Sequence, residues 1–199
     1  MSKMIGKIIF RIIFILVFFN LCKQEPQAEL EKWVLTNQKA DAIAMDKLAQ
    51  LTFEHSYKST EWKENGQLFI EYGGSSALTF SDKKKYVPMI LLDLARRTYR
   101  TFFYGEKRGL KELRVSLVKP LYVQNAEGLQ NEIQEFEIYR IKIDEDVLQK
   151  VRTIWNKEFP DSFVSDENGM PQGEQLEFLE IWQKNWKVEL NQFSRIEVD

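Results

Sequence analysis

The chain has 199 residues, with 28 Lys or Arg, 30 Asp or Glu, one His and one Cys. Its formal net charge of −2 argues against a nucleic-acid partner, because such binding favours a strongly basic surface. A single Cys excludes an intrachain disulfide and a multi-Cys zinc site, and a single His excludes a two-His metal site. Phosphate-binding loops and the H-E-x-x-H and C-x-x-C motifs are missing from the sequence, so we expect no cofactor.

The first 22 residues differ in composition from the rest. Lys3, Lys7 and Arg11 precede or interrupt an apolar stretch that continues unbroken over 12–19, and no acidic residue occurs before Glu25. A basic start followed by a short apolar run is typical of a secretory signal peptide. The uncharged stretch 12–22 has only about half of the roughly 20 apolar residues that a membrane-spanning helix needs. We therefore expect residues 1–21 to be a signal peptide.

The only cysteine lies at the end of this run, in the segment Phe19-Asn20-Leu21-Cys22. The segment resembles the lipobox of bacterial lipoproteins in a relaxed form, with Phe19 and Leu21 where Leu and a small residue are common. This resemblance covers the first 22 residues. It implies that the thiol of Cys22 receives a diacylglycerol, that the signal is cleaved just before it, and that 22–28 are the lipidated Cys and a short tether. An uncleaved signal anchor and simple secretion are the alternatives.

The same resemblance implies a cellular address. A lipid anchor attaches the protein to a membrane of the bacterial cell envelope, and Lys23, in place of an Asp, favours the outer membrane over the inner one. Residues 1–22 contain three basic and no acidic residues, so the remainder has a net charge of about −5. That charge gives no attraction to anionic lipid, and membrane attachment therefore depends on the anchor.

The rest of the chain, 29–199, has the length of one domain. Apolar residues at three-and-four spacing predict one long helix over 29–57 and another over 86–104, in which Pro88 is tolerated in the first turn. Between the two helices, 67–72 predicts a strand, and 77–80 predicts a short antiparallel return after a Gly-rich turn.

Two long strands follow in the sequence. Alternating apolar residues predict a strand over 113–123, in which Lys119 is the exception in the apolar phase. Residues 133–143 predict its antiparallel partner, with a bulge near Tyr139 because the alternation slips there. Asp144 is the expected N-cap of a short helix through Trp155, 159–173 is expected to be a loop, and a last helix is expected to run as far as Phe193.

This order of elements predicts an α+β fold, a single domain with an antiparallel sheet of about four strands packed against helices. The residues expected in the core are Trp33, Leu48, Leu91, Leu94, Phe102, Val115, Leu117, Phe136, Ile141 and Trp155.

Two polar segments have residue types that occur in functional sites. His55 beside Ser56 suggests a general base, but neighbours on a helix point about 100° apart and no G-x-S-x-G motif is present. A partly buried or exposed histidine at a helix end is therefore favoured. An acidic loop has oxygen ligands of the kind that calcium prefers, but it lacks the EF-hand spacing, which favours a solvated loop. Its residues are Asp161, Asp166, Glu167, Asn168 and Gly169.

Basic and aromatic residues also form groups along the chain. The densest basic cluster consists of Arg96, Arg97, Arg100, Lys107 and Arg108. It is interpreted as the solvated outer face of a helix, with contact to an anionic headgroup or a glycan phosphate as the alternative. Lys83, Lys84 and Lys85 are interpreted as a polar loop. Trp182 and Trp186, four residues apart, favour core packing over a surface that stacks on sugars.

Together these features favour a membrane-anchored lipoprotein of the cell envelope that acts as a non-enzymatic binding or interaction module, with an envelope protein or polymer as a further partner. One alternative is a carrier of a small apolar ligand, which a deep apolar pocket beside the sheet would support. Another is an envelope hydrolase that uses carboxylates, which two acids of raised pKa in a concave site would support. An exposed apolar patch would favour a protein partner.

Overall fold

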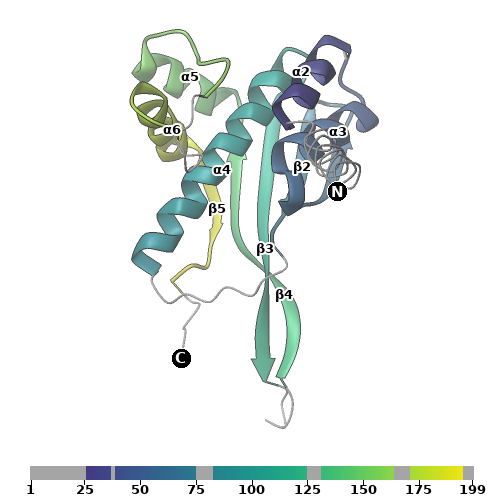
Figure 1. Cartoon of the computed structure of the whole chain (residues 1–199), viewed down its shortest axis with the longest axis vertical. Coiled ribbons are helices and arrows are strands. Elements are labelled where there is room, and N and C mark those ends of the chain that lie inside the picture. Colours follow the sequence, from purple (N-terminus) through teal and green to yellow (C-terminus); the bar gives the residue numbers. More distant parts are fainter. Residues whose placement is uncertain (1–25, 37–38, 75–82, 125–130, 164–170, 195–199) are drawn as a thin grey trace, which may run out of the picture.

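The computed structural model describes residues 26–36, 39–74, 83–124, 131–163 and 171–194 (Figure 1). The predicted signal peptide, Cys22, the predicted return strand 77–80 and four of the five residues of the acidic loop lie outside these ranges. The elements are α2 (Pro26–Thr36), α3 (Ala42–Phe53), the 3-10 turn η1 (Glu54–Ser56), β1 (Tyr57–Lys63), β2 (Gln67–Tyr72), α4 (Lys83–Glu106), β3 (Glu112–Gln124), β4 (Asn131–Ile143), α5 (Glu145–Trp155), α6 (Glu174–Asn185) and β5 (Lys187–Asn191).

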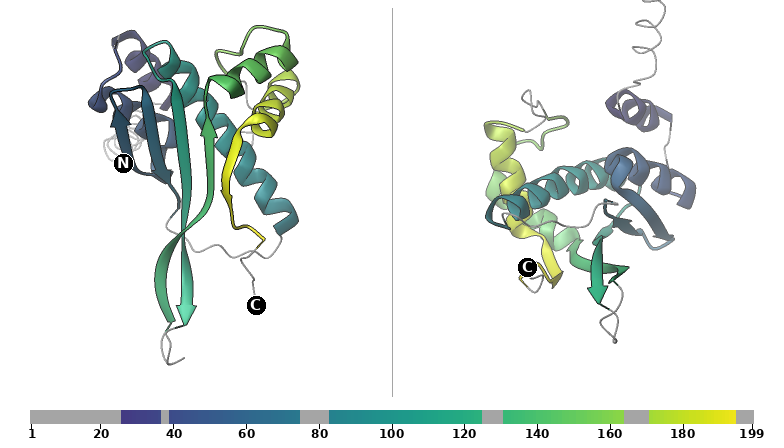
Figure 2. Two further views of the ribbon diagram at one scale, coloured as in Figure 1. Left: turned by 180° about the vertical axis from the view of Figure 1, so that it is seen from behind. Right: turned by 60° about the horizontal axis from the view of Figure 1, so that its bottom comes forward.

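The strands form one sheet in the order β1-β2-β3-β4-β5, which confirms the α+β class with five strands in place of about four. Three neighbouring pairs are antiparallel, but β2 and β3 are parallel. The parallel pair arises because α4 carries the chain from the end of β2 back to the start of β3, as parallel strands require. Figure 1 shows α4 crossing the sheet diagonally, and the view from behind in Figure 2 has the strands in front of it.

The predicted helix 29–57 is wrong, because two helices and the first residue of a strand occupy it. α2 begins within the predicted tether, at Pro26, and ends at Thr36. Asp41 then starts α3 by accepting a hydrogen bond from the backbone N–H of Ala44 at 2.8 Å. A capping side chain of this kind supplies an acceptor for an otherwise unpaired donor, so it begins a new helix although the apolar spacing continues through it.

The two long strands β3 and β4 pair as predicted. Their register shifts between Leu117 and Val118, where Leu117 faces Tyr139 and Val118 faces Glu137, so Ile138 is the additional residue of a bulge at the predicted place. Beyond it the pair extends past the other strands as a two-stranded arm (Figure 1). Phe136 lies on this arm and is 38% exposed, so its placement in the core was wrong.

The C-terminal prediction is correct in its first half. α6 contains Leu179 and Trp182, but the helix ends at Asn185 and 187–191 form β5 against β4. Asp144 caps α5 as expected, with its side chain accepting from the backbone N–H of Val147. The loop prediction agrees with the described parts of 159–173, apart from an isolated bridge residue at Pro171.

The core lies between the helices and the sheet. Leu91 is half-buried, and the other expected core residues apart from Phe136 are buried: Trp33, Leu48, Leu94, Phe102, Val115, Leu117, Ile141 and Trp155. An aromatic cluster around Tyr99 joins α4 to α6, with ring centroids 4.7 Å from Phe178 and 5.2 Å from Trp182. The indole N–H of Trp182 donates to Thr98 at 3.2 Å. Among the described helices, none combines the length and apolar character needed to cross a membrane.

Candidate functional site

A pocket of about 230 Å³ lies between the first half of α4 and the sheet, at the end of β2. The sheet contributes Tyr72, Leu117 and Lys119, and α4 contributes Met89, Ile90 and Asp93. Its volume is below the roughly 300–1,000 Å³ of sites for drug-sized ligands, so it suits a small molecule. We call it the α4–sheet pocket.

Strand geometry places the three sheet residues on one face. Tyr72 and Leu117 are partners in the parallel register of β2 and β3, and Leu117 and Lys119 are two residues apart on β3. Because side chains alternate along a strand, residues two apart point to the same side of the sheet. The pocket therefore lies over the apolar phase of β3, and Lys119 brings a charge into it.

Gly73 allows the end of β2 to pass close to β3. A Cβ atom at this position would lie 1.8 Å from the carbonyl oxygen of Val118, where no side chain fits. The backbone N–H of Gly73 donates to the carbonyl of Ser56 at 2.8 Å, which fixes η1 against the end of the strand. Gly73 and Gly74 thus make one wall of the pocket from backbone.

The Tyr72 hydroxyl is an unpaired polar group at this site. The residue is 5% exposed, and its ring packs against Phe53 with centroids 5.1 Å apart. Its hydroxyl is buried and has no hydrogen-bond partner within the part of the chain that the structure describes. Burial, followed by the charge of Asp93, raises the pKa of Tyr72 well above its ordinary value. The phenol therefore stays neutral and can donate a hydrogen bond.

Lys119 is the charged side chain of the lining beside Tyr72, and its Nζ, unlike the Tyr72 hydroxyl, is not one of the fully buried atoms that lack a partner. It is 8% exposed, and no ion pair or hydrogen bond of its ammonium group is seen in the described ranges. Burial lowers the pKa of Lys119, and the positive charge of Lys58 lowers it further. Lys58, by contrast, pairs with Glu135. Buried polar groups in native proteins are nearly always hydrogen-bonded, so the unpaired Tyr72 hydroxyl makes this pocket the stronger candidate site, with Lys119 as the charged group beside it.

Asp93 does not neutralise Lys119, because its carboxylate is already paired with two arginines. Its carboxylate accepts from Arg96 at 2.9 Å and from Arg97 at 2.6 Å. Arg97 is 5% exposed and also donates to the carbonyl of Thr52 at 3.0 Å. Asp93 thus forms a charge-compensated edge of the pocket.

The interpretation of the basic cluster as a solvated helix face is wrong for part of it. Arg97 is buried, and burial lowers the pKa of both Arg100 and Arg108. Arg108 joins two helices, donating to the carbonyls of Tyr104 and Val34 at 2.6 Å each. Lys107 is exposed, as expected. The side chains of 83–85 lie outside the described residues, and these positions form the start of α4 in place of the predicted loop. The local sequence did not indicate which of these arginines are buried, because Arg97 also binds the carbonyl of Thr52 in α3 and Arg108 also binds that of Val34 in α2.

The other predicted site residues remain apart from one another and from the pocket's polar groups. His55 lies on η1 and is exposed, which agrees with the favoured interpretation. Ser56 lines the pocket, and its carbonyl accepts a hydrogen bond from the backbone N–H of Gly73. Asp161 is exposed, and within the described ranges no three His, Cys, Asp or Glu side chains gather in the manner of a metal site. Trp182 and Trp186 are buried, which confirms core packing.

Two carboxyl groups in the described ranges have clearly shifted pKa values, and both shifts are downward. The hydrogen bond from Arg140 lowers the pKa of Glu137. For Asp144, burial acts upward, but hydrogen bonds from Lys187 and Lys142 outweigh it and lower the pKa. A general acid needs a shift in the opposite direction, so neither group supports the hydrolase alternative.

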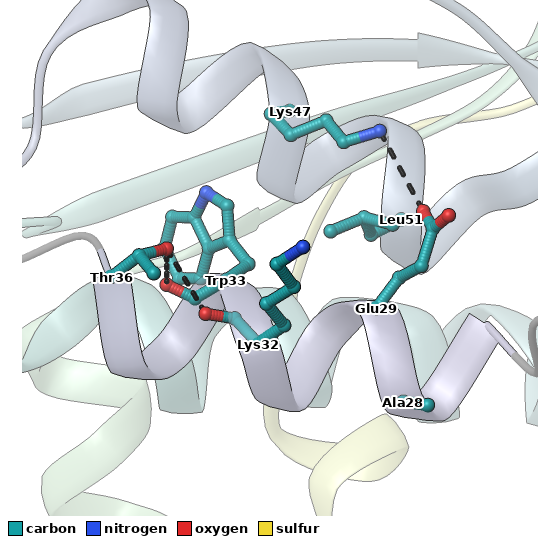
Figure 3. Close-up of a pocket in the computed structure, with 7 residues that line it drawn as sticks. All are labelled: Ala28, Glu29, Lys32, Trp33, Thr36, Lys47 and Leu51. Carbon is teal, nitrogen blue, oxygen red and sulfur yellow. Dashed lines mark hydrogen bonds and ion pairs between the residues drawn. The ribbon is translucent and has the colours of Figure 1, made fainter.

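A second pocket, of about 350 Å³, lies between α2 and α3 (Figure 3). Glu29 and Lys47 face each other across it at 3.8 Å, and their side chains are 41% and 51% exposed. Trp33 and Leu51 form its apolar part. Its paired charges are exposed to solvent, where such pairs contribute little, so it is the weaker candidate for a site.

Sequence reasoning missed Tyr72, Gly73 and Lys119 as a site. One signal was visible, since Lys119 interrupts the apolar phase of a strand that is otherwise apolar on that face. Tyr72 gave no such signal because a tyrosine at the end of a strand is ordinary.

No protein-family model, curated protein or solved structure matches this chain. The described residues define an α+β domain with a small, largely apolar pocket that is lined by the unpaired hydroxyl of Tyr72 and by Lys119.

Proposed function

We propose that this chain is a lipid-anchored protein of the bacterial cell envelope whose α+β domain acts by binding, without catalysis, and that its ligand is a small, largely apolar molecule. The lipid anchor is Cys22, by its resemblance to a lipobox, and the outer membrane is the favoured address. The observation that supports ligand binding is the α4–sheet pocket, in which the buried Tyr72 hydroxyl is unpaired and Lys119 brings a charge into a largely apolar lining.

The lining of the pocket suits an apolar ligand body. Leu117 is buried in the wall, Ile90 is half-buried, and Met89 is 60% exposed. Met is flexible and adapts to irregular ligand shapes. Each methylene group that a ligand buries contributes about 0.8 kcal/mol, so even a short chain gains useful affinity.

Exposed apolar residues give less support to a protein partner. The large ones among the described side chains are spread over six elements, with Ile133 and Phe136 sharing β4. The others are Leu35, Ile43, Met89, Ile154 and Val188. Single apolar residues on a surface are normal, whereas a partner interface presents a contiguous patch. A small ligand is therefore the favoured occupant of this domain.

The anchor is tested by metabolic labelling with an alkyne fatty acid. We expect label in the wild-type protein and none in Cys22→Ser, because a hydroxyl group does not replace the thiol as the acceptor of the diacylglycerol. Equal labelling of both would refute the lipid anchor, and so would an intact Met1 in the membrane fraction.

The ligand role is tested with the full chain in phosphatidylcholine nanodiscs, titrated calorimetrically with hexanoate and with hexanamide against empty nanodiscs. Ile90→Trp should fill the pocket and abolish binding. Ile154→Trp, on the exposed face of α5, is the matched control and should leave binding unchanged. Absence of binding heat for both compounds, or equal effects of the two substitutions, would refute the ligand role.

A further inference from the structure

We propose that the ligand of the α4–sheet pocket is a small monoanion, a short-chain or aryl carboxylic acid whose carboxylate is bound by Lys119 and Tyr72. This inference rests on the proposed ligand-binding function and specifies the chemistry of its ligand.

Tyr72 and Lys119, the two groups of the pocket that the proposal uses, are both donors. The Lys119 ammonium has three N–H bonds and no acceptor, and the neutral Tyr72 phenol has one O–H to give. The Tyr72 hydroxyl is buried and has no acceptor in the described protein, and no ion pair of Lys119 is seen there, so a ligand that supplies an acceptor would satisfy both groups. A carboxylate has two oxygens and accepts both bonds at once, and bonds between an ammonium and a carboxylate are about twice as strong as neutral ones.

The charges around the pocket favour an anion at the Lys119 side. The charge that acts most on Lys119 is that of Lys58, which has the same sign. Asp93 is the carboxylate of the pocket lining, and Arg96 and Arg97 compensate it. Burial disfavours the charged form of Lys119, and an anion beside it would favour that form. Binding of an anion would therefore offset part of the desolvation cost of the ammonium group.

The same charges limit the ligand to a single negative charge. Among the described lining residues Lys119 is the one ammonium group, and Arg96 and Arg97 are already paired with Asp93, so a second negative charge would have no cation of its own. A phosphate dianion would leave one charge uncompensated in an apolar recess, at a high desolvation cost. The volume of about 230 Å³ further restricts the ligand to a short body, which rests against Ile90 and Leu117.

The test compares two ligands with nearly the same shape on the unaltered full chain in nanodiscs. Hexanoate and hexanamide share the alkyl body and the planar head, but only hexanoate is charged. We expect hexanoate to bind at least about tenfold more tightly, as charge-assisted hydrogen bonds predict. Inorganic phosphate should not compete with it.

Three variants locate the contact. Lys119→Met should remove the preference for hexanoate and leave hexanamide binding within about threefold of its original affinity, because Met keeps the apolar stem. Tyr72→Phe should weaken hexanoate several-fold, since it removes one donor. Lys58→Met is the matched control, because it removes the same charge from β1 outside the pocket lining, and it should change hexanoate binding by less than about threefold.

The outcomes separate the two proposals. Equal affinities for the two compounds would overturn the carboxylate inference and leave the small-ligand function standing. Equal losses in Lys58→Met and Lys119→Met would overturn direct contact, since they would indicate a general field effect. Failure of both compounds to bind would overturn both proposals. The comparison on the unaltered chain needs no variant, so poor folding of a variant would not obscure the result.

Discussion

Replacing Gly73 by Ala tests the close approach of β2 and β3 that forms the wall of the α4–sheet pocket. The backbone of Gly73 has no positive φ, so alanine would suffer no conformational strain there. In open space this substitution would stabilise the protein by roughly 0.4–1 kcal/mol, because the unfolded chain loses freedom. The sign of the effect therefore depends on packing alone.

The packing at Gly73 leaves no room for a methyl group. Its Cβ would lie 1.8 Å from the carbonyl oxygen and 2.9 Å from the carbonyl carbon of Val118, and both atoms are backbone. A normal C···O contact is at least about 3.3 Å, so the strands would have to separate by roughly 1.5 Å. Such overpacking costs typically about 1–3 kcal/mol, and a forced backbone shift belongs at the upper end. We expect a net loss of about 2–3 kcal/mol.

The assay is urea denaturation of the wild type and Gly73→Ala, followed by Trp fluorescence, with equal slopes as the check on two-state behaviour. Gly173→Ala is the control. Gly173 has φ +59 and ψ −130 and no atom within 4 Å of an added Cβ, so its loss of about 1–3 kcal/mol should come from backbone strain alone, without a packing clash. If Gly73→Ala is as stable as the wild type or more stable, the close approach of Gly73 to Val118 is refuted.

Three further substitutions test other parts of the structure. Asp41→Ala should lower the free energy of unfolding by about 1 kcal/mol through loss of the α3 cap, while Asp41→Asn should retain it; equal losses in urea denaturation would contradict the cap. Lys119→Met should raise the free energy of unfolding by up to about 1 kcal/mol in the absence of ligand, because it replaces a lysine whose charged form burial disfavours, and a lower melting temperature would show that Lys119 has a partner in the protein. The hydrogen bond from Arg140 lowers the pKa of Glu137, so the stability that this carboxylate contributes is present above its unfolded pKa of about 4.3 and is lost as the pH falls through its folded value. Glu137→Gln should therefore be less stable than the wild type at pH 7, with a difference that narrows below about pH 4; a difference independent of pH would contradict the ion pair.

Local sequence patterns were sufficient for the elements whose evidence lies within a few residues. The three-and-four spacing over 86–104 corresponds to α4, the alternation over 113–123 to β3, and the slipped alternation at Tyr139 to the bulge in β4. Asp144 caps α5 because a carboxylate before an amphipathic run acts on the adjacent N–H groups. The lipid attachment at Cys22 is likewise a prediction from local sequence, and it awaits the labelling experiment.

Other elements depended on partners far along the chain. β1 alternates between half-buried and exposed residues and pairs with β2, while β5 pairs with β4, and neither contains the apolar pattern of a core strand. Their backbone hydrogen bonds are satisfied by a neighbouring strand, which no local pattern reveals. The parallel pairing of β2 with β3 likewise requires the crossover of α4.

The sequence by itself determined the class of the fold, most helices and strands, and a charged residue in the apolar phase of β3. Only the tertiary structure decided where the charge of Lys119 lies and which groups surround it. Tyr72 and Lys119 are 47 positions apart in the chain, and the register of β2 and β3 brings them to one face under α4. A lysine in a strand is ordinary when it lies on a solvated face, and its position in a pocket beside a buried, unpaired tyrosine hydroxyl becomes visible only when every neighbouring element is in place.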